Sequence, residues 1–282
     1  MRSKQYEVKL ALVVFLVTAS VAMAETRKEF RFPVSGKASV SITNVYGPIA
    51  VKSAPAGQVF IVAVLKSDKV EVDQTQSGDR IDIISHLLSG ADMQSGQVEY
   101  EVQVPIDTSV TLHTTTGAIT AEKLQGDLTV EGAAANVSLR DIANAHVHVK
   151  TLDGPITLAN INNGHVEVTS ISGNVVMTAV NGKLVEVNSA SGKIRYDGDF
   201  GYAGVYILSS HTGDIEATAP SYASFDVSAR SEKGKVENDF TLEPRHTSFV
   251  VKAGSAFAGT MNKAASSVKL FSMSGKIHLK KR

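Results

Sequence analysis

The chain has 282 residues, with equal numbers of basic and acidic side chains, 28 of each. This balance argues against a nucleic-acid partner, which requires a clustered basic surface. Cysteine is absent, and this excludes a disulfide framework, a thiolate metal site and a cysteine nucleophile. Aromatic residues make up only 6% of the chain, whereas valine, isoleucine, threonine, serine and glycine are abundant, a composition typical of β-structure.

Residues 1–24 have the features of a secretory signal peptide. A basic start precedes an apolar run from Leu10 to Val21, and Ala22-Met23-Ala24 fits the small-x-small cleavage rule. The run is shorter than the roughly 20 residues that a membrane-spanning helix needs. We therefore expect an exported protein whose mature chain begins at Glu25 and has no transmembrane segment, located in the periplasm, at the cell surface or outside the cell.

Residues 25–105 are expected to form the less regular, N-terminal part of one continuous domain that spans residues 25–282. Alternating apolar residues flank Gly47, and a nearly continuous apolar run covers Val59–Leu65. Val98–Pro105 then gives an alternating strand that ends at proline. These strands are predicted to cap the stack that follows, because a stacked sheet must not present a bare edge.

Residues 106–282 are expected to consist of regular repeats, clearest between His146 and Tyr196, where one pattern recurs every 19 residues. Apolar residues lie seven, five and two positions before an anchor glycine, and two and four positions after it. This alternation predicts two short strands per repeat, each with one buried face. The position two before the anchor, held by Leu152, Ile171 and Ala190, is expected to share this burial. The anchor glycines are Gly47, Gly117, Gly154, Gly173, Gly192, Gly213, Gly234 and Gly275.

A single repeat should not fold alone. It buries about six apolar side chains, each contributing about 1.5–3 kcal/mol, while ordering its backbone costs about 1–2 kcal/mol per residue. Stacking offsets this cost, because each repeat pairs its strand edges with the next one. The chain is therefore predicted to be all-β: a two-sheeted parallel β-solenoid with coils of 19–21 residues. A right-handed β-helix or β-roll is expected, because parallel crossovers are overwhelmingly right-handed.

The turns and the last coil carry more specific expectations. Each anchor glycine is expected to adopt a positive φ. Thr151, Ser170 and Ser189, three positions before their anchors, are expected to bond to the turn backbone. The coil around Gly275 is expected to end the stack, where the charges of Lys280–Arg282 would protect its exposed edge.

Beyond Tyr196 the anchor spacing widens to 21 residues, and the extra length lies in a glycine-rich loop. Insertions in solenoids fall on one face and often carry binding, and aromatic rings beside carboxylates suit sugars or peptides. The alternative is that the rings only cover a local irregularity. The candidate ligand-binding residues of this loop are Asp197, Asp199, Phe200, Tyr202 and Tyr206.

Three histidines form a weaker candidate site. His146 and His165 occupy the same position in adjacent coils, and His148 lies two residues along the strand. Neighbouring strands are about 4.8 Å apart, so these rings could converge on a metal ion. The alternative is a polar surface on which Glu167 pairs with His148 across the strands. No metal or other cofactor is predicted.

No catalytic residue is predicted either. Asp197 with Asp199, and Asp214 with Glu216, are carboxylate pairs of the kind that glycoside hydrolysis uses, but alternating acids on a strand are usually solvated. The sequence has no nucleophile elbow, His-Glu-x-x-His motif or calcium-binding nonapeptide repeat. We expect a protein that is not an enzyme, with a polysaccharide-active enzyme as the alternative.

An alternating strand followed by serial glycine turns resembles the bacterial candidate-adhesin family of β-strand-repeat proteins. The residues that carry this resemblance are Tyr100–Pro105, Thr116–Ile119, Ser172–Val175 and Ser191–Ile194. The likeness covers about Val40 to Leu279 and implies the repeat fold, but the family has no established catalytic residues to transfer. We expect an adhesin-like binding or structural module of the bacterial envelope, whose partner is an envelope or extracellular protein or a glycan. A periplasmic scaffold or envelope-signalling partner is the alternative.

Overall fold

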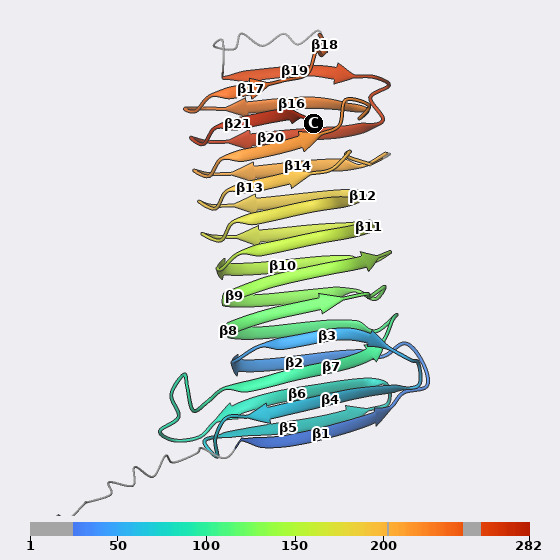
Figure 1. Cartoon of the computed structure of the whole chain (residues 1–282), viewed down its shortest axis with the longest axis vertical. Helices are drawn as coiled ribbons and strands as arrows, with labels where there is room; N and C mark the ends of the chain where they lie inside the picture. Colours follow the sequence, from blue (N-terminus) through green and yellow to red (C-terminus); the bar gives the residue numbers. More distant parts are fainter. Residues whose placement is uncertain (1–24, 202, 245–254) are drawn as a thin grey trace, which may run out of the picture.

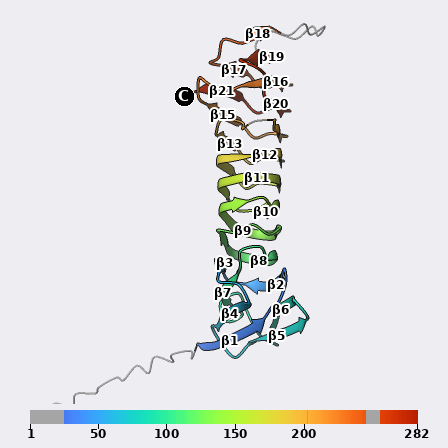
Figure 2. The ribbon, with the colours of Figure 1, turned by 90° about the vertical axis from the view of Figure 1, so that its right-hand side faces the viewer.

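The computed structural model of the protein describes residues 25–201, 203–244 and 255–282. Every regular element within these residues is a β-strand, and the strands stack into one elongated body (Figure 1). Two sheets form opposite walls of a narrow column, with the apolar core between them (Figure 2). The predicted all-β solenoid is confirmed.

The regular middle of the stack is built from parallel coils that pair in register. Its strands are β8 (Ser109–Glu122), β9 (Leu128–Ala143), β10 (His146–Asp153), β11 (Ile156–Ser170) and β12 (Val175–Ser189). Val147 pairs with Val166, and Val166 pairs with Val185, and all three side chains are buried. The valine column expected from the repeat therefore lies in the core. Each long strand of this region except β10 contributes to both sheets.

The N-terminal part caps both sheets. Its strands are β1 (Thr26–Pro33), β2 (Ser39–Tyr46), β3 (Ile49–Ala54), β4 (Gln58–Leu65), β5 (Val70–Ser77), β6 (Arg80–Leu87) and β7 (Val98–Pro105). On the first face, which contains β10, β2 lies between β8 and the β5–β6 hairpin. On the second face, β3 lies between β8 and the antiparallel set β7–β4–β1. The change from parallel to antiparallel pairing marks the cap.

The C-terminal coils do not stack in chain order. Their strands are β13 (Ile194–Asp197), β14 (Val205–Ser210), β15 (Ile215–Ala219), β16 (Phe225–Ser231), β17 (Val236–Asn238), β18 (Glu243–Pro244), β19 (Ala256–Met261), β20 (Ser266–Ser272) and β21 (Ile277–Lys281). β20 pairs with both β14 and β16, and β21 pairs with both β15 and β17. The final coil is thus inserted between two earlier ones, and the C-terminus lies within the stack (Figure 1).

The prediction that Lys280–Arg282 protects an exposed final edge is therefore wrong. The chain leaves β15 and forms β16 one coil further along, and β19 and β18 then continue the first sheet in antiparallel pairing. The last two strands, β20 and β21, occupy the coil position between β14–β15 and β16–β17. β21, the strand that carries Lys280, consequently has a neighbouring strand on each side.

The anchor glycines are required for two different reasons. Gly47, Gly117 and Gly154 have φ of 111°, 143° and 104°, as predicted. The other anchors are not among the positive-φ residues, so the prediction is wrong for Gly173, Gly192, Gly213, Gly234 and Gly275. A Cβ atom at Gly173 would instead overlap the carbonyl oxygen of Gly154 in the coil below, and the same clash recurs up the stack. Close stacking, rather than backbone conformation, selects glycine there.

The turn serines act as predicted. The Ser170 hydroxyl donates to the Gly173 carbonyl and the Ser189 hydroxyl to the Gly192 carbonyl, both at 3.1 Å. Thr151 differs, because its buried hydroxyl has no hydrogen-bond partner within the described residues.

The position two before the anchor is exposed, contrary to the prediction. Leu152 and Ile171 each retain 51% of their accessible surface, and Ala190 is exposed as well. The preceding residue, such as Thr151, is the last to point inward before the turn. Leu152 still lies within β10, one residue after the inward-facing Thr151, so the alternation of the strand turns its side chain toward solvent.

Candidate functional site

The aromatic rings of the predicted binding loop lie in the core. Phe200 and Tyr206 are both 0% exposed, and Tyr202 lies outside the described residues. Tyr196 stacks on Phe200 at 4.7 Å between ring centroids, and Tyr206 meets Phe200 edge-on at 5.2 Å. Neither Phe200 nor Tyr206 presents a face to a ligand, so the part of the prediction that depends on them is wrong. The rings fill the space where the repeat lengthens, as the alternative held.

Hydrogen bonds and burial hold this aromatic cluster in place. The Tyr196 hydroxyl donates to the Val180 carbonyl at 3.2 Å and accepts from the Phe200 amide at 3.0 Å. Burial raises the pKa of Tyr206 to about 12 and also raises the pKa of Tyr196. Both phenols are therefore neutral at physiological pH.

The two aspartates of the loop have structural partners. Asp199 accepts the Gly201 amide at 2.9 Å, and Asp197 forms an ion pair with Arg282 at 3.0 Å. The four candidate residues that the structure describes are therefore two buried rings and two engaged carboxylates, and they do not form one exposed site.

The three histidines do come together on the first face. The rings of His146 and His165 lie 5.1 Å apart between centroids. The Glu167 carboxylate bridges His148, at 3.2 Å, and His165, at 3.1 Å. The expected cross-strand pair of His148 and Glu167 is confirmed. Within the part of the chain that the structure describes, no group of three or more histidine, aspartate or glutamate side chains is arranged to hold a metal ion.

Glu216, a member of one candidate carboxylate pair, belongs to an ion-pair network. Its oxygens lie 3.0 Å from Lys280 Nζ, 3.4 Å from Arg195 Nε and 3.7 Å from Lys193 Nζ, and its side chain is 15% exposed. The hydrogen bond from Lys280 is the largest cause of a pKa below the usual range of a glutamate. Its sequence partner Asp214 accepts the Lys276 amide at 2.7 Å instead. Glu216 is thus an ionised anchor for cations.

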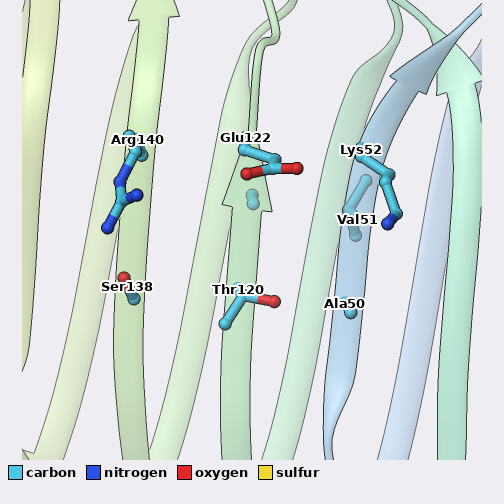
Figure 3. Close-up of a pocket in the computed structure, with 8 residues that line it drawn as sticks. Ala50, Val51, Lys52, Thr120, Glu122, Ser138 and Arg140 are labelled. Atoms are coloured by element: carbon cyan, nitrogen blue, oxygen red, sulfur yellow. The ribbon is translucent and has the colours of Figure 1, made fainter.

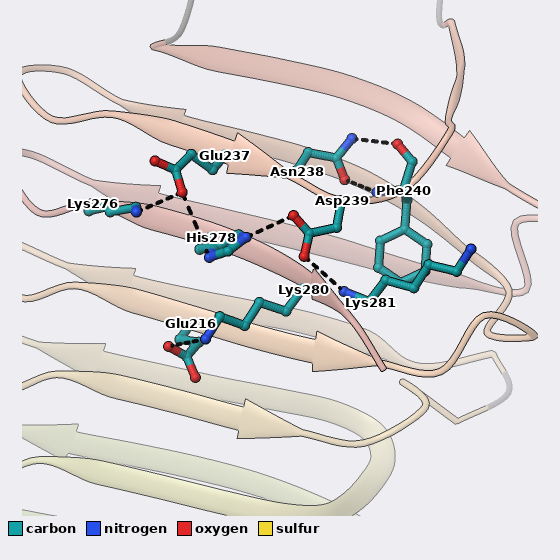
Figure 4. Close-up of polar contacts among 9 residues, drawn as sticks. All are labelled: Glu216, Glu237, Asn238, Asp239, Phe240, Lys276, His278, Lys280 and Lys281. Atoms are coloured by element: carbon teal, nitrogen blue, oxygen red, sulfur yellow. Dashed lines mark hydrogen bonds and ion pairs between the residues drawn. The ribbon is translucent and has the colours of Figure 1, made fainter.

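The network continues on the other side of β21 (Figure 4). Lys276 Nζ lies 2.6 Å from Glu237 Oε2, and His278 Nε2 lies 2.9 Å from Asp239 Oδ1. The carboxylates on β17 and just after it, together with Glu216 on β15, therefore hold the inserted strand from both sides. We call this set of side chains the C-terminal clamp: Glu216, Glu237, Asp239, Lys276, His278 and Lys280.

A site that the sequence did not predict lies on the second face, where β3, β8 and β9 are neighbours (Figure 3). It is a shallow hollow of about 290 Å³. Short side chains form its lower row, and long charged side chains form the next row. The lower row is Ala50, Thr120 and Ser138, and the charged row is Lys52, Glu122 and Arg140.

The charges of this row have no partners among the residues that the structure describes. Among the described residues, no ion pair or side-chain hydrogen bond involves Lys52, Glu122 or Arg140. Lys52 and Arg140 are exposed and Glu122 is half-buried. A ligand would therefore meet charges that are already at the surface and not engaged by the fold.

A signal for this site was present in the sequence. The three charged residues stand five positions after Gly47, Gly117 and Ala135. Aligning the coils on their anchors would have placed the charges side by side. It would not have shown that they lack partners.

In-register coils stacked on glycine contacts define a repeat protein of the β-solenoid class. The Toastrack DUF4097 family model matches residues 38–280, and the chain belongs to this family. No curated protein matches the sequence.

Solved structures that are similar to the chain include the following two. A candidate adhesin from Bacteroides fragilis has a TM-score of 0.51 and 11% sequence identity, and the match covers 91% of this chain and 97% of that one. A candidate cell adhesion protein from Clostridium sporogenes has a TM-score of 0.30 and 13% identity, covering 91% of this chain and 100% of that one. The first likeness supports the fold. The Toastrack DUF4097 match confirms the predicted resemblance to a family of β-strand-repeat proteins.

Among the described residues, there is no helix with the length and apolarity needed to cross a membrane.

Proposed function

We propose that the protein is an exported, non-enzymatic binding module of the bacterial envelope, adhesin-like, which recognises its partner through the second face. The observation that carries this proposal is the hollow bordered by Lys52, Glu122 and Arg140, whose charges are unpaired within the described chain. The signal-like composition of residues 1–24 supports export. Family membership and the likeness to a candidate adhesin fold are in keeping with it.

The stacked architecture suits this role. Main-chain pairing fixes the strands of neighbouring coils at about 4.8 Å, so outward side chains form rows at constant spacing. When a partner binds across several coils, the protein loses little conformational entropy, because the rows are already ordered. Ordered rows of side chains along a long face are therefore suited to binding an extended partner.

The absence of cysteine allows a direct test of which face is used. Thr157 lies on the second face beside Ser138, and Thr169 lies on the first face, and both are exposed. Thr157→Cys and Thr169→Cys would each be labelled with a short photo-crosslinker and exposed to envelope fractions. We expect discrete crosslinked products from the Thr157→Cys protein and few from the Thr169→Cys protein. Equal products from both, or none from either, would contradict the proposal.

Cell fractionation tests the location separately. We expect the mature chain, beginning at Glu25, outside the inner membrane. Exposure to external protease in intact cells would indicate adhesin-like recognition at the surface, whereas protection would indicate a scaffold or signalling partner within the periplasm. Recovery of the full-length chain from the cytoplasm alone would contradict export.

A further inference from the structure

The charged row of the hollow alternates in sign along the stack. Lys52 pairs in register with Glu122, and Glu122 pairs in register with Arg140. The residues that continue this row on the two flanking strands are neutral. Gln103 is in register with Lys52, and Ala159 is in register with Arg140. The second face therefore presents a cation, an anion and a cation on three successive strands, each about 4.8 Å from the next.

This spacing limits which polymer fits. In an extended peptide, side chains on one side recur every second residue, about 6.6 Å apart. This repeat is longer than the spacing of the strands, so successive peptide side chains would not stay opposite successive charges of the row. A pyranose ring in an extended linear glycan advances the chain by a length close to the spacing of neighbouring strands, which is about 4.8 Å. A glycan that runs along the stack axis would therefore place one sugar over each coil.

We propose that this hollow binds a linear acidic glycan that carries a carboxylate on every second sugar. This inference rests on the proposed function and names the ligand class for the same face. One carboxylate pairs with Lys52 and the next with Arg140, whose guanidinium donates two parallel hydrogen bonds to the carboxylate oxygens. The sugar between them is neutral, and its hydroxyl groups donate hydrogen bonds to the Glu122 carboxylate.

The lower row provides room for the sugar rings. Ala50 leaves space beside Lys52, and Thr120 and Ser138 add hydroxyl groups beside Glu122 and Arg140. Glu122 also gives the site its selectivity, because a glycan with a carboxylate on every sugar would place a negative charge against it. Like charges at this distance repel one another. Glu101 lies on β7, in register with Ala50, and it repels further carboxylates of a glycan that extends from Lys52 toward β7.

The test uses the mature chain and three defined probes in affinity electrophoresis at low salt. Hyaluronan oligosaccharides carry a carboxylate on alternate sugars, polygalacturonate oligosaccharides carry one on every sugar, and dextran is neutral. We expect binding in the order hyaluronan, polygalacturonate, dextran. Salt should weaken the binding, because the contacts are exposed ion pairs.

Three substitutions locate the site. Lys52→Gln and Arg140→Gln should each weaken hyaluronan binding by about threefold, and by about tenfold together, as expected for exposed ion pairs. Glu122→Gln should strengthen polygalacturonate binding and so reduce the preference for hyaluronan. Lys150→Gln, at an exposed position of the first face, is the matched control and should bind as the parent does.

Each other outcome overturns the inference in a recognisable way. If no glycan is retained while Thr157→Cys still crosslinks to a protein, the ligand class is wrong and the proposed use of the second face stands. If hyaluronan binds equally to the Lys52→Gln, Arg140→Gln and Lys150→Gln proteins, the glycan binds elsewhere. If the parent prefers polygalacturonate, the alternation of charge does not select the ligand. Circular dichroism of each variant checks that the fold is retained.

Discussion

The two halves of the second face use charge in opposite ways. Around the hollow, Lys52, Glu122 and Arg140 are neighbours in register yet form no ion pair within the described chain. In the C-terminal clamp, Glu216 alone contacts three cations, and Lys280 lies 3.0 Å from it. Lys52 and Lys280 occupy the same position, five residues after their anchor glycines. The repeat therefore sets where a charge stands, and its neighbours decide whether it is engaged.

The difference follows from what each half must hold together. At the hollow, the long strands β8 and β9 pair in parallel along most of their length. The inserted strand β21 has five residues, and its neighbour β17 has three. Short strands offer few main-chain hydrogen bonds, so side-chain contacts carry a larger share of their attachment. We interpret the paired charges as contacts that attach β21 to its neighbouring strands, and the unpaired charges as a surface for ligands.

The largest effect is expected from the core beneath the C-terminal half. Phe200→Ala removes a fully buried ring that contacts Tyr196, Tyr206 and Phe225. Such truncations cost about 3–5 kcal/mol, and urea unfolding should show a loss of this size. Because neighbouring repeats mainly stabilise one another, hydrogen exchange should rise first in β13–β16. A variant with unchanged stability would show that Phe200 is a surface residue after all.

The next effect is expected at the coil junction that carries the inserted strand. A Cβ atom at Gly275 would overlap the backbone carbonyl of Gly213, which is part of the framework and cannot rotate away. Gly275→Ala should therefore destabilise the protein by about 1–3 kcal/mol, as measured by urea unfolding. Ser274→Ala, the adjacent exposed position, is the control and should change stability little. Equal effects from the two would argue that close stacking does not select glycine here.

The sequence could predict the coil but not its place in the stack. Alternation around glycine at a fixed interval identified the valine column of Val147, Val166 and Val185, because burial of one face requires a period of two. The order of coils is not encoded in this way. Any two coils with matching apolar columns can pair, so nothing in the pattern of Ser266–Lys281 distinguishes an inserted coil from a terminal one.

The candidate site shows a similar limit. An aromatic residue in a glycine-rich loop is compatible with either burial or exposure, and for Phe200 the core provides the larger gain. The charges of the hollow were visible as a common offset from the anchors. Their lack of partners depends on side-chain contacts that a single sequence does not specify, so Lys52 and Lys280 look alike until the fold is known.

A smaller effect is expected from acid. The hydrogen bond from Lys280 lowers the pKa of Glu216, and contacts with His278 and Lys276 lower the pKa of Asp239 and Glu237 respectively. A carboxylate whose pKa is lower in the folded state contributes stability above its unfolded pKa, and this is lost as pH falls through the folded value. The melting temperature should therefore fall as the pH drops below about 4.5, the ordinary glutamate value.

Glu216→Gln is the variant that assigns this acid effect. It should lower the melting temperature at pH 7 and reduce the fall at low pH, since its contribution is then absent at both. Because the cluster lies at the surface, we expect a contribution of about 1 kcal/mol or less, reduced further by salt. An unchanged pH dependence in this variant would show that other carboxylates account for the loss.

The smallest effect on stability is expected in the hollow, where Lys52→Gln and Lys280→Gln form a matched pair at one position of the repeat. Lys52 has no partner within the described chain, so its loss should change stability by no more than about 0.5 kcal/mol. Lys280→Gln removes the closest cation from Glu216 and should lower the melting temperature measurably more. Glycan binding should reverse the order, falling in the Lys52→Gln protein and staying constant in the Lys280→Gln protein. Equal loss of stability in both variants would contradict the distinction between charges that attach strands and charges that recognise a ligand on this face.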